Sequence, residues 1–461
     1  MKISIVGAGS VRFALQLIGD IAKTENLSGA FISLMDINQE KLHTVHFLAQ
    51  KYAEELGAQL SFEKTTSLEQ TLEGADFVIN TAAPLYPERY EKVTETGEKH
   101  GYYRGIDSQE FNMVSTYSYV ICSYPDLKLS LEIARIMEKL CPEAWLLQTA
   151  NPVFEVTQLL TQTTRAKVIG FCHGFSGVFE VFRALGLESQ EVDWQVAGVN
   201  HGIWMNRFLY RGKDAYPLLE EWIEKNASSW KPRTPWDVQL SPAVIDMYRF
   251  YGMLPIGDTC RNGSWKYNYN LETKRRWYGE FGGIDNEVER PRYHQQLRES
   301  KRKLLDLAQE IQKHPHSKLT EIYPELFSKE KMSGEQHIPF INALSGGPEA
   351  RLILNLQNQG VISGLPDDVV VEIPVVVRKD GLYPEKLEPD LTWRIKEMYL
   401  MPRILRMRWA LEAFLSQDKR VLEEFLVRDP RTKSFEQIQA VLEEIMSLPI
   451  NEELARYFGY R

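Results

Sequence analysis

The stretch KISIVGAGSV, residues 2–11, decides which fold the chain adopts. A short apolar run that meets Gly-X-Gly and continues with apolar residues at helical spacing is typical of a buried strand turning into a helix. Gly7 permits the tight turn, and Gly9 lets backbone N–H groups approach an anionic group at the helix N-terminus. With Ser10 and Val11 opening the helix, the stretch predicts a dinucleotide-binding turn.

The next strand pattern supports this prediction. AFISLMD, residues 30–36, ends in Asp36, which is placed to accept hydrogen bonds from ribose hydroxyls. An acid at this position favours NAD over NADP, because it repels a 2′-phosphate. Arg12 replaces the third glycine of the usual fingerprint, and the gap from Gly9 to Asp36 is longer than usual. A strand-to-helix turn that binds nothing therefore stays an alternative at this point.

Further strand patterns indicate a parallel sheet. DFVINTA, residues 76–82, places Asn80 and Ala82 at a strand end, where the backbone normally contacts a cofactor. AWLLQTANPV, residues 144–153, ends in an Asn-Pro segment similar to the one beside the nicotinamide in lactate and malate dehydrogenases. Because strands alternate with helical patterns, we expect crossover helices and a doubly wound sheet.

The character of the sequence changes near residue 195. Tryptophan and tyrosine become frequent, residues 353–377 have strand patterns, and the tail from about 395 to 461 is helical and charged. A chain of 461 residues also exceeds what one core usually supports. We predict a Rossmann-type NAD-binding domain over residues 1–195. An α+β domain over residues 196–461 would serve catalysis, substrate binding and oligomerisation.

Composition and charge narrow the class of protein. Hydrophobic residues make up 43% and charged residues 25%, which is ordinary for a soluble enzyme. A net charge of −9 argues against nucleic acid as a partner. The apolar run 369–377 is far shorter than a membrane span, and the N-terminus does not have the pattern of a signal peptide. The four cysteines form no C-x-x-C pair. We expect a cytoplasmic protein with reduced thiols and no membrane partner.

Two apolar strand patterns in the middle of the chain end in segments that carry cysteine or histidine. GFCHG, residues 170–174, carries Cys172 and His173, and GVNHGIW carries His201. A buried cysteine or a hydrogen-bonded core histidine is the ordinary reading of either residue alone. Together, at two strand ends, Cys172 and His201 could ligate a metal. Two ligands are too few for a closed structural zinc site, but they suit a catalytic divalent ion that keeps positions open for substrate or water.

Taken together, these segments resemble glycoside hydrolase family four, the NAD- and Mn²⁺-dependent glycosidases. The resemblance covers nearly the whole chain. The matching segments, in order, are KISIVGAGS (2–10), GYYRGIDSQEFNMVS (101–115), QTANPVFEVT (148–157), GFCHG (170–174), VDWQVAGVNHGIW (192–204), MYRFYGMLPIGDT (247–259) and NQGVISGLPDDVVVEIP (358–374). The resemblance implies a lactate/malate-dehydrogenase-like fold, a sugar as substrate, and a homodimer or homotetramer.

The family's chemistry, as the resemblance implies it, begins with hydride transfer from C3 of the sugar to NAD. The C3 ketone acidifies the C2 proton, a base removes it, and the C1–O bond breaks by elimination. Water then adds and the hydride returns. The resemblance makes Cys172 and His201 the ligands of Mn²⁺, with Co²⁺ and Ni²⁺ as alternatives. It gives Asn151 the role of orienting the sugar, and Glu110 and Asn112 that of contacting substrate.

The acid and the base are also assigned through the resemblance. His173 stands where phospho-sugar branches carry an aspartate, so it is predicted to protonate the leaving group; binding a substrate hydroxyl or carboxylate is the alternative. Asp258, in the segment GDT, is predicted to be the base, with Tyr251 second. Tyr251 could equally belong to an aromatic core.

The run Cys-His-Gly-Phe after residue 171 is similar to the α-glucuronidase branch of the family. Thr116 stands where the glucosidase branch tends to carry an aspartate, and losing a carboxylate suits a uronate. Arg261 and Arg12 are candidate partners for its C6 carboxylate. We therefore expect an α-glucuronidase, with α-glucosidase or α-galacturonidase as alternatives. Outside the family, an NAD-dependent 2-hydroxy-acid dehydrogenase or a non-catalytic NAD-binding regulator would leave Cys172 and His201 unexplained.

Overall fold

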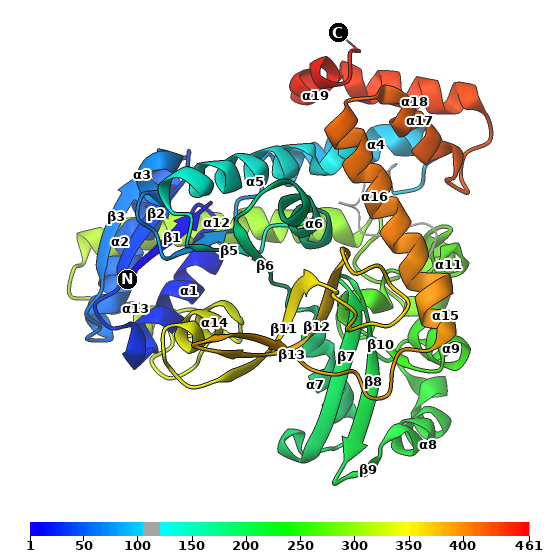
Figure 1. Cartoon of the computed structure of the whole chain (residues 1–461), viewed down its shortest axis with the longest axis horizontal. Coiled ribbons are helices and arrows are strands. Elements are labelled where there is room, and N and C mark those ends of the chain that lie inside the picture. Colours follow the sequence, from blue (N-terminus) through cyan, green and yellow to red (C-terminus); the bar gives the residue numbers. More distant parts are fainter. Residues whose placement is uncertain (105–119, 461) are drawn as a thin grey trace.

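A computed structural model, which describes residues 1–104 and 120–460, places one mixed sheet at the centre of the molecule (Figure 1). Its first half consists of parallel strands in the order β3-β2-β1-β4-β5-β6. The strands are β1 (Lys2–Val6), β2 (Phe31–Met35), β3 (Ser61–Thr65), β4 (Phe77–Asn80), β5 (Trp145–Gln148) and β6 (Lys167–Gly170). This is the strand order of a dinucleotide-binding Rossmann sheet, so the predicted fold class is confirmed.

The strand order explains where ligands bind. β1 pairs in parallel with both β2 and β4, so strands that come later in the chain are added first on one side of β1 and then on the other. In open α/β sheets, ligands bind at this switch point, outside the carboxyl ends of the strands. The segments that follow β1, β4, β5 and β6 therefore lie along one edge, and they carry the Gly-X-Gly turn, Ala82, Asn151 and Cys172.

Helices cover the parallel half on two sides. The helices are α1 (Val11–Lys23), α2 (Gln39–Glu55), α3 (Leu68–Leu72), α4 (Glu88–Lys99), α5 (Val120–Leu140), α6 (Val153–Thr163) and α7 (Gly177–Ala184). In α1, Ala14, Leu15, Ile18 and Ile21 are buried at helical spacing, which fixes the face that packs inward. α3, α5 and α6 contact one another, while α1 contacts α2 and the later helices α12 and α14.

The second half of the sheet is antiparallel and joins the first without a break. It contains β7 (Val192–Val199), β8 (Gly202–Tyr210), β9 (Lys213–Asp214), β10 (Leu254–Ile256), β11 (Ala350–Gln357), β12 (Val370–Arg378) and β13 (Gly381–Pro384). β11 meets β6 where Asn355 pairs with Gly170. The predicted boundary at residue 195 falls inside β7, a strand of the antiparallel half, and the division into two domains stays a prediction.

The remaining helices are α8 (Tyr216–Asn226), α9 (Pro242–Tyr251), α10 (Trp265–Asn268), α11 (Leu271–Tyr278), α12 (Glu289–Lys313), α13 (Leu319–Ile322), α14 (His337–Leu344), α15 (Trp393–Ile395), α16 (Met401–Ser416), α17 (Lys419–Val427), α18 (Phe435–Ser447) and α19 (Glu452–Tyr457). Of these, α12, α13 and α14 pack on α1 or α2 beside the parallel half, and the others lie beside the antiparallel half or in the C-terminal cluster. The helical tail is therefore confirmed. In Figure 1, α16 (orange) rises to the C-terminal cluster, where α18 packs on α4.

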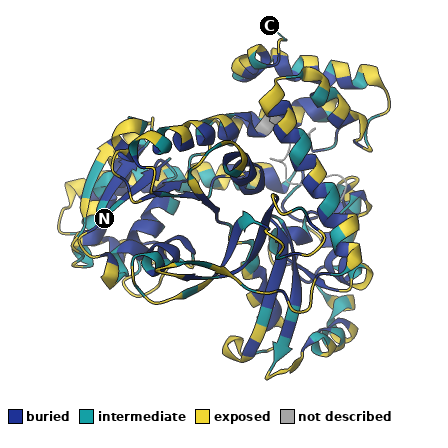
Figure 2. Ribbon diagram, viewed as in Figure 1, coloured by how far each residue is buried: buried dark blue, intermediate teal, exposed yellow. Residues whose placement is uncertain are grey.

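Burial follows the sheet. Apart from β3, β9 and β13, the strands are buried along most of their length, whereas the outer faces of the C-terminal helices are exposed (Figure 2). One buried ion pair, between Arg403 of α16 and Glu155 of α6, ties the C-terminal helices to the helix that follows Asn151. Because removal of one partner leaves an unpaired buried charge, such a pair holds its two elements in one arrangement.

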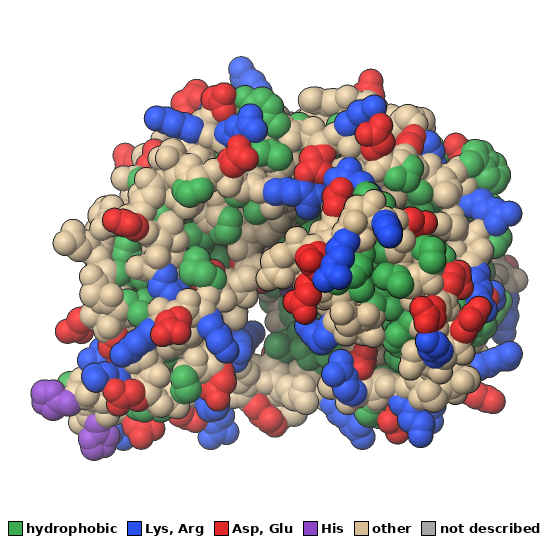
Figure 3. All heavy atoms as spheres, turned by 90° about the horizontal axis from the view of Figure 1, so that it is seen from below, with side chains coloured by type: hydrophobic (Ala, Val, Ile, Leu, Met, Phe, Trp, Pro, Cys, Tyr) green, Lys and Arg blue, Asp and Glu red, His purple; other side chains and the backbone are tan. Residues whose placement is uncertain are grey.

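The surface carries charges of both signs. On the face shown in Figure 3, acidic and basic side chains are interspersed, and the surface is hollowed between the two halves of the molecule. Among the described residues, no helix combines the length and the apolar character needed to cross a membrane.

Candidate active site

The turn after β1 forms one wall of a cavity of about 620 Å³. Gly7 has φ +84°, and a Cβ there would lie 2.4 Å from the Cα of Ala82, so only glycine fits. The N–H of Gly9 donates to Oδ2 of Asp36 at 2.7 Å, and a Cβ on Gly9 would meet that oxygen at 2.5 Å. Gly7, Gly9, Ser10, Asp36 and Ala82 all line the cavity. The structure thus brings five of the predicted cofactor residues together.

The other two predicted cofactor residues have buried side chains and do not line this cavity. Val11 is 1% exposed at the start of α1. The amide of Asn80 donates to Ser130 and Gln148, and its Oδ1 accepts from the N–H of Ala82 at 3.2 Å. Both residues therefore support the cavity wall from beneath. Lys301 of α12 also lines the cavity; nothing local in the sequence points to it.

A second cavity, of about 210 Å³, adjoins the first and shares residues 83–86 with it. Asn151 lines it, together with Arg89 and the buried Asp126. Burial raises the pKa of Asp126 well above its usual value, against the opposing effect of Arg89. Asn151 therefore lies beside the dinucleotide cavity, as the resemblance implies. Glu110 and Asn112, predicted to contact substrate, lie outside the described residues, as does Thr116.

Three side chains converge at the same edge of the sheet. Cys172 follows β6, His201 lies in the turn between β7 and β8, and Asp258 lies in the short helix η5 (Gly257–Cys260) after β10. Their ligand atoms all lie within 4.8 Å of one another, and Nε2 of His201 is 3.2 Å from Oδ2 of Asp258. The turns can meet because Gly257, at φ +61°, contacts the carbonyl of Gly174 so closely that a Cβ would lie 1.9 Å from its oxygen.

The protonation of these groups suits a divalent ion. Burial, followed by the charges of Glu372 and Asp258, raises the pKa of the Cys172 thiol well above its usual value. Burial lowers the pKa of His201, so its imidazole is neutral. Although burial raises the pKa of Asp258, Arg261 and then His201 hold it below its usual range. Sulfur, imidazole and carboxylate together fit a transition-metal ion, whose binding releases the thiol proton.

A buried amide and a buried carboxyl support the cysteine. The amide of Asn200 donates to Oε2 of Glu372 at 2.9 Å. Glu372 lies in β12 and is 1% exposed, and burial raises its pKa to about 8. In the sequence, Glu372 is a single acidic residue within the apolar run 369–377. Nothing in the sequence indicates that it faces Cys172. Supporting groups of this kind orient and tune metal ligands.

His173 and Tyr251 lie in contrasting surroundings. The side chain of His173 is 75% exposed, and its Nδ1 lies 3.7 Å from Oε1 of Glu335. Tyr251 packs against the rings of Trp204 and Tyr399, and burial raises its pKa to about 12. The structure therefore brings Asp258, and not Tyr251, into the Cys172–His201 cluster, and Tyr251 belongs to an aromatic core.

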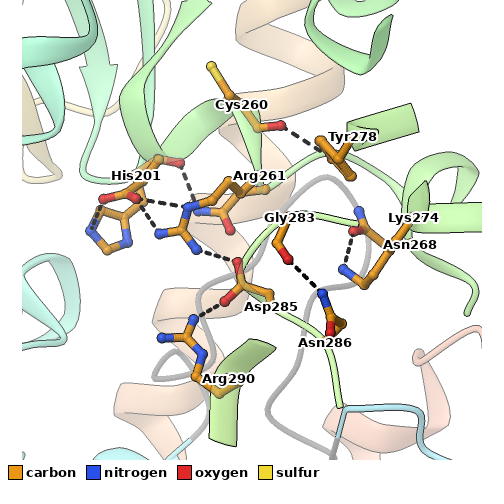
Figure 4. Close-up of polar contacts among 12 residues, drawn as sticks. His201, Cys260, Arg261, Asn268, Lys274, Tyr278, Gly283, Asp285, Asn286 and Arg290 are labelled. Carbon is orange, nitrogen blue, oxygen red and sulfur yellow. Dashed lines mark hydrogen bonds and ion pairs between the residues drawn. The ribbon is translucent and has the colours of Figure 1, made fainter. Parts of the chain in front are cut away.

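Arg261 does not present a free guanidinium. It binds the carboxylates of Asp258 and Asp285, and Asp285 also binds Arg290, as Figure 4 shows. The predicted pairing of Arg261 with a substrate carboxylate therefore competes with two internal partners. Arg290 was not among the site residues predicted from the sequence. Its Nε is buried and has no hydrogen-bond partner among the described residues.

Arg12, the other arginine considered for a substrate carboxylate, donates to the hydroxyl of Tyr323 at 3.0 Å in exposed surroundings.

A further cation is buried near Arg261. Burial, then Arg104 and Arg261, lowers the pKa of Lys274 to about 7, and its ammonium group donates to Asn268 (Figure 4).

Residues 2–188 match the model of the family 4 glycosyl hydrolases, and residues 196–432 match that family's C-terminal domain. The chain belongs to family 4 of the glycosyl hydrolases. Membership confirms the resemblance seen in the sequence and makes the protein a glycosidase. The model coverage also shows that both halves of the sheet belong to the family's architecture.

Three relatives illustrate the range of the family. The chain is 25% identical to an alpha-galacturonidase of Thermoanaerobacter italicus, over 93% of this chain and 92% of the relative. It is 23% identical to an alpha-galactosidase of Bacillus subtilis, over 94% of each chain. Its fold matches a 6-phospho-alpha-glucosidase from gut microorganisms, solved with NAD and Mn²⁺, with a TM-score of 0.74, 15% identity and coverage of 96% and 97%.

A buried histidine behind this glycosidase site makes stability depend on pH. His337 stacks on Phe171 with ring centroids 4.5 Å apart, and its Nε2 lies 2.6 Å from Oγ1 of Thr149. Burial lowers its pKa to about 3. An unfolded histidine has a pKa of about 6.5, so acid protonates the unfolded state first. Stability is full above that value and falls, by up to about 1.4 kcal/mol per pH unit, as the pH drops toward 3.

We expect His337→Gln to lose less thermal stability than wild type between pH 7 and pH 5, because it removes this proton linkage. Thermal midpoints at the two pH values measure the effect. His316→Gln, the same change at an exposed position, should keep the wild-type difference. An equal drop in midpoint for His337→Gln and wild type would contradict the assignment.

Proposed function

We propose that this family 4 glycosidase hydrolyses α-glycosides of a hexuronic acid, α-glucuronides first, with NAD and Mn²⁺ as cofactors. The observation that carries the proposal is the cluster of Cys172, His201 and Asp258 at the edge of the sheet that also bears the dinucleotide cavity. A glycosidase that used only two carboxylates would need neither feature. A 2-hydroxy-acid dehydrogenase would leave the cluster without a use.

The residues present fit both groups. Gly7, Gly9 and Ser10 would hold the pyrophosphate, with Asp36 at the adenosine ribose. Cys172 and His201 would hold the ion, leaving positions for substrate oxygens. When bound, NAD supplies a hydride acceptor for C3 of the sugar, and the divalent ion supplies a Lewis acid for its O2–O3 edge.

Asp258 is the group that we assign to the C2 proton. Arg261 keeps its carboxylate ionised, as a proton acceptor must be, and the carboxylate lies within the cluster that would face C2 and C3. Tyr251 is the weaker candidate, because its high pKa and its aromatic surroundings oppose ionisation. His173 is next to Cys172 and exposed, so its ring can reach the glycosidic oxygen and protonate it as the C1–O bond breaks.

Charge favours a uronate. Arg261 and Arg290 share Asp285, so once Asp258 serves the reaction these two guanidinium groups face a single internal carboxylate. The surplus positive charge suits the C6 carboxylate of a hexuronic acid, as does Nε of Arg290, which has no hydrogen-bond partner within residues 1–104 and 120–460. A neutral glucoside would leave that charge uncompensated.

An α-galacturonidase is the second candidate, since the alpha-galacturonidase of Thermoanaerobacter italicus matches this chain over most of both lengths. Glucuronides and galacturonides differ only in configuration at C4, so the charge argument serves both. α-Glucosidase activity is the third. Location in the cytoplasm and assembly as a homodimer or homotetramer stay predictions.

The wild-type protein is the first test. We expect hydrolysis of 4-nitrophenyl α-glucuronide, and of aldobiouronate-type α-glucuronides, to require NAD, Mn²⁺ and a reductant, with no accumulation of NADH. 4-Nitrophenyl α-galacturonide and α-glucoside, with malate as the dehydrogenase substrate, complete the panel. Cys172→Ser should lose hydrolysis and Mn²⁺ binding but keep NAD binding. Steady NADH production from malate, or full hydrolysis without NAD, would overturn the proposal.

Arg290→Ala tests the substrate class. Because a hydrogen bond to a charged group contributes about 1.5–3 kcal/mol, we expect kcat/KM to fall about 10- to 100-fold on the uronide and far less on the glucoside. Arg292→Ala, the same change on the exposed side of α12, is the matched control and should leave both rates unchanged. Equal losses on uronide and glucoside for Arg290→Ala would remove Arg290 as the carboxylate partner.

A further inference from the structure

The segment Ser333–His337, with sequence SGEQH, lies against the strand end that carries Cys172 and His173. Gln336 donates to the carbonyl of Ile353 at 2.8 Å and to that of Cys172 at 3.4 Å. His337 stacks on Phe171, the residue before Cys172. The sequence did not indicate that this segment meets Cys172, because Gln336 and Cys172 lie 164 positions apart along the chain.

The segment is fixed at its other end as well. The buried carboxylate of Asp20, in α1, accepts from both the N–H and the hydroxyl of Ser333. The Ser333 hydroxyl in turn accepts from the N–H of Glu335 at 3.1 Å. Glu335 therefore lies between two residues that are fixed by hydrogen bonds, Ser333 and Gln336. Together they determine its position relative to Cys172 at the end of β6.

The carboxylate of Glu335 faces two histidines. Oε1 lies 3.7 Å from Nδ1 of His173, and Oε2 lies 3.8 Å from Nδ1 of His337. The side chain is 19% exposed, whereas that of His173 is 75% exposed. Asp20 and His337 are the other ionisable groups near this carboxylate on neighbouring elements. Neither reaches His173 by a hydrogen bond or ion pair among the described residues. Asp258 also interacts with His173 through charge, but Glu335 is the carboxylate that forms an ion pair with its ring among the described residues.

We propose that Glu335 is a positioning residue for the leaving-group acid. By attracting Nδ1 of His173, the carboxylate fixes the ring so that Nε2 points away from the protein segment and toward the place of the aglycone oxygen. A carboxylate on one ring nitrogen is a common means of fixing the orientation and tautomer of the other. In the step that it serves, the Nε2–H bond breaks, the proton goes to the glycosidic oxygen, and the C1–O bond electrons stay with that oxygen.

This proposal rests on the proposed glycosidase function and on His173 as its acid. It predicts a dependence on the leaving group. A 4-nitrophenolate departs without help, whereas an alkyl or sugar alkoxide needs the proton, so loss of the acid's orientation slows only the second kind of substrate. A purely structural role for Glu335, or one in metal binding, would slow both kinds equally.

The experiment compares kcat/KM of wild type and Glu335→Gln on 4-nitrophenyl and methyl α-glycosides of the preferred uronic acid. We expect rates within about threefold on the nitrophenyl substrate and a loss of about 10²-fold on the methyl substrate. Glu335→Asp should recover part of the lost rate. Mn²⁺ affinity, followed by electron paramagnetic resonance titration, should be unchanged in both variants. Glu330→Gln, at an exposed position nearby, is the matched control.

His173→Ala and the double variant complete the test. We expect His173→Ala to show the same selective loss, and Glu335→Gln to add nothing to it, because both changes remove one function. Equal losses of Glu335→Gln on the two substrates, no loss on either, or additive losses in the double variant would overturn the proposal. Failure of the glycosidase function itself would be visible separately, as absence of NAD-dependent hydrolysis in the wild type.

Discussion

The close approach of β6 and β11 at Gly170 is the constraint on which the site depends. A Cβ at Gly170 would lie 2.6 Å from the hydroxyl of Thr157 and 2.8 Å from the Cβ of Asn355, so only glycine lets the parallel and antiparallel halves join. Two residues later the chain reaches Cys172, and across the antiparallel strands it reaches His201 and Asp258. A dinucleotide fold thus gains the Cys172–His201–Asp258 cluster because a second half-sheet continues the first.

Local signals made the first half of the fold predictable. Gly7 and Gly9 are required by backbone geometry within a few residues, and β1, β2 and β4 are short apolar runs with helices between them. Cys172 and His201 stood out in the sequence as residues at two strand ends. Their role as metal ligands was predicted from a resemblance that is carried by several motifs in order. Asp258 was predicted as a base, and its place in the cluster follows from the contact between Gly257 and Gly174, which lie 83 positions apart.

The parts that escaped prediction depend on contacts between distant segments. Three residues acquire a role only through tertiary packing. Asn200 and Glu372 meet when β12 packs near Cys172, and Glu335 meets His173 when the segment before α14 packs there. Arg261 was predicted to bind a substrate carboxylate, and this role stays a prediction. In the structure its guanidinium binds Asp258 and Asp285, and Nε of Arg290 is buried without a hydrogen-bond partner among the described residues. Ion pairing of this kind is set by tertiary packing, so residue type and spacing alone do not reveal which arginine faces a ligand.

The central claim is that hydrolysis proceeds through loss of the C2 proton beside the metal cluster, with Asp258 as its acceptor. The most direct measurement is hydrolysis of the preferred α-uronide in D₂O, with mass spectrometry and proton NMR of the released uronic acid. The account predicts one deuterium at C2 of the product, and loss of both turnover and C2 exchange in Asp258→Asn. A product that retains its C2 proton while NAD is still required would contradict the account.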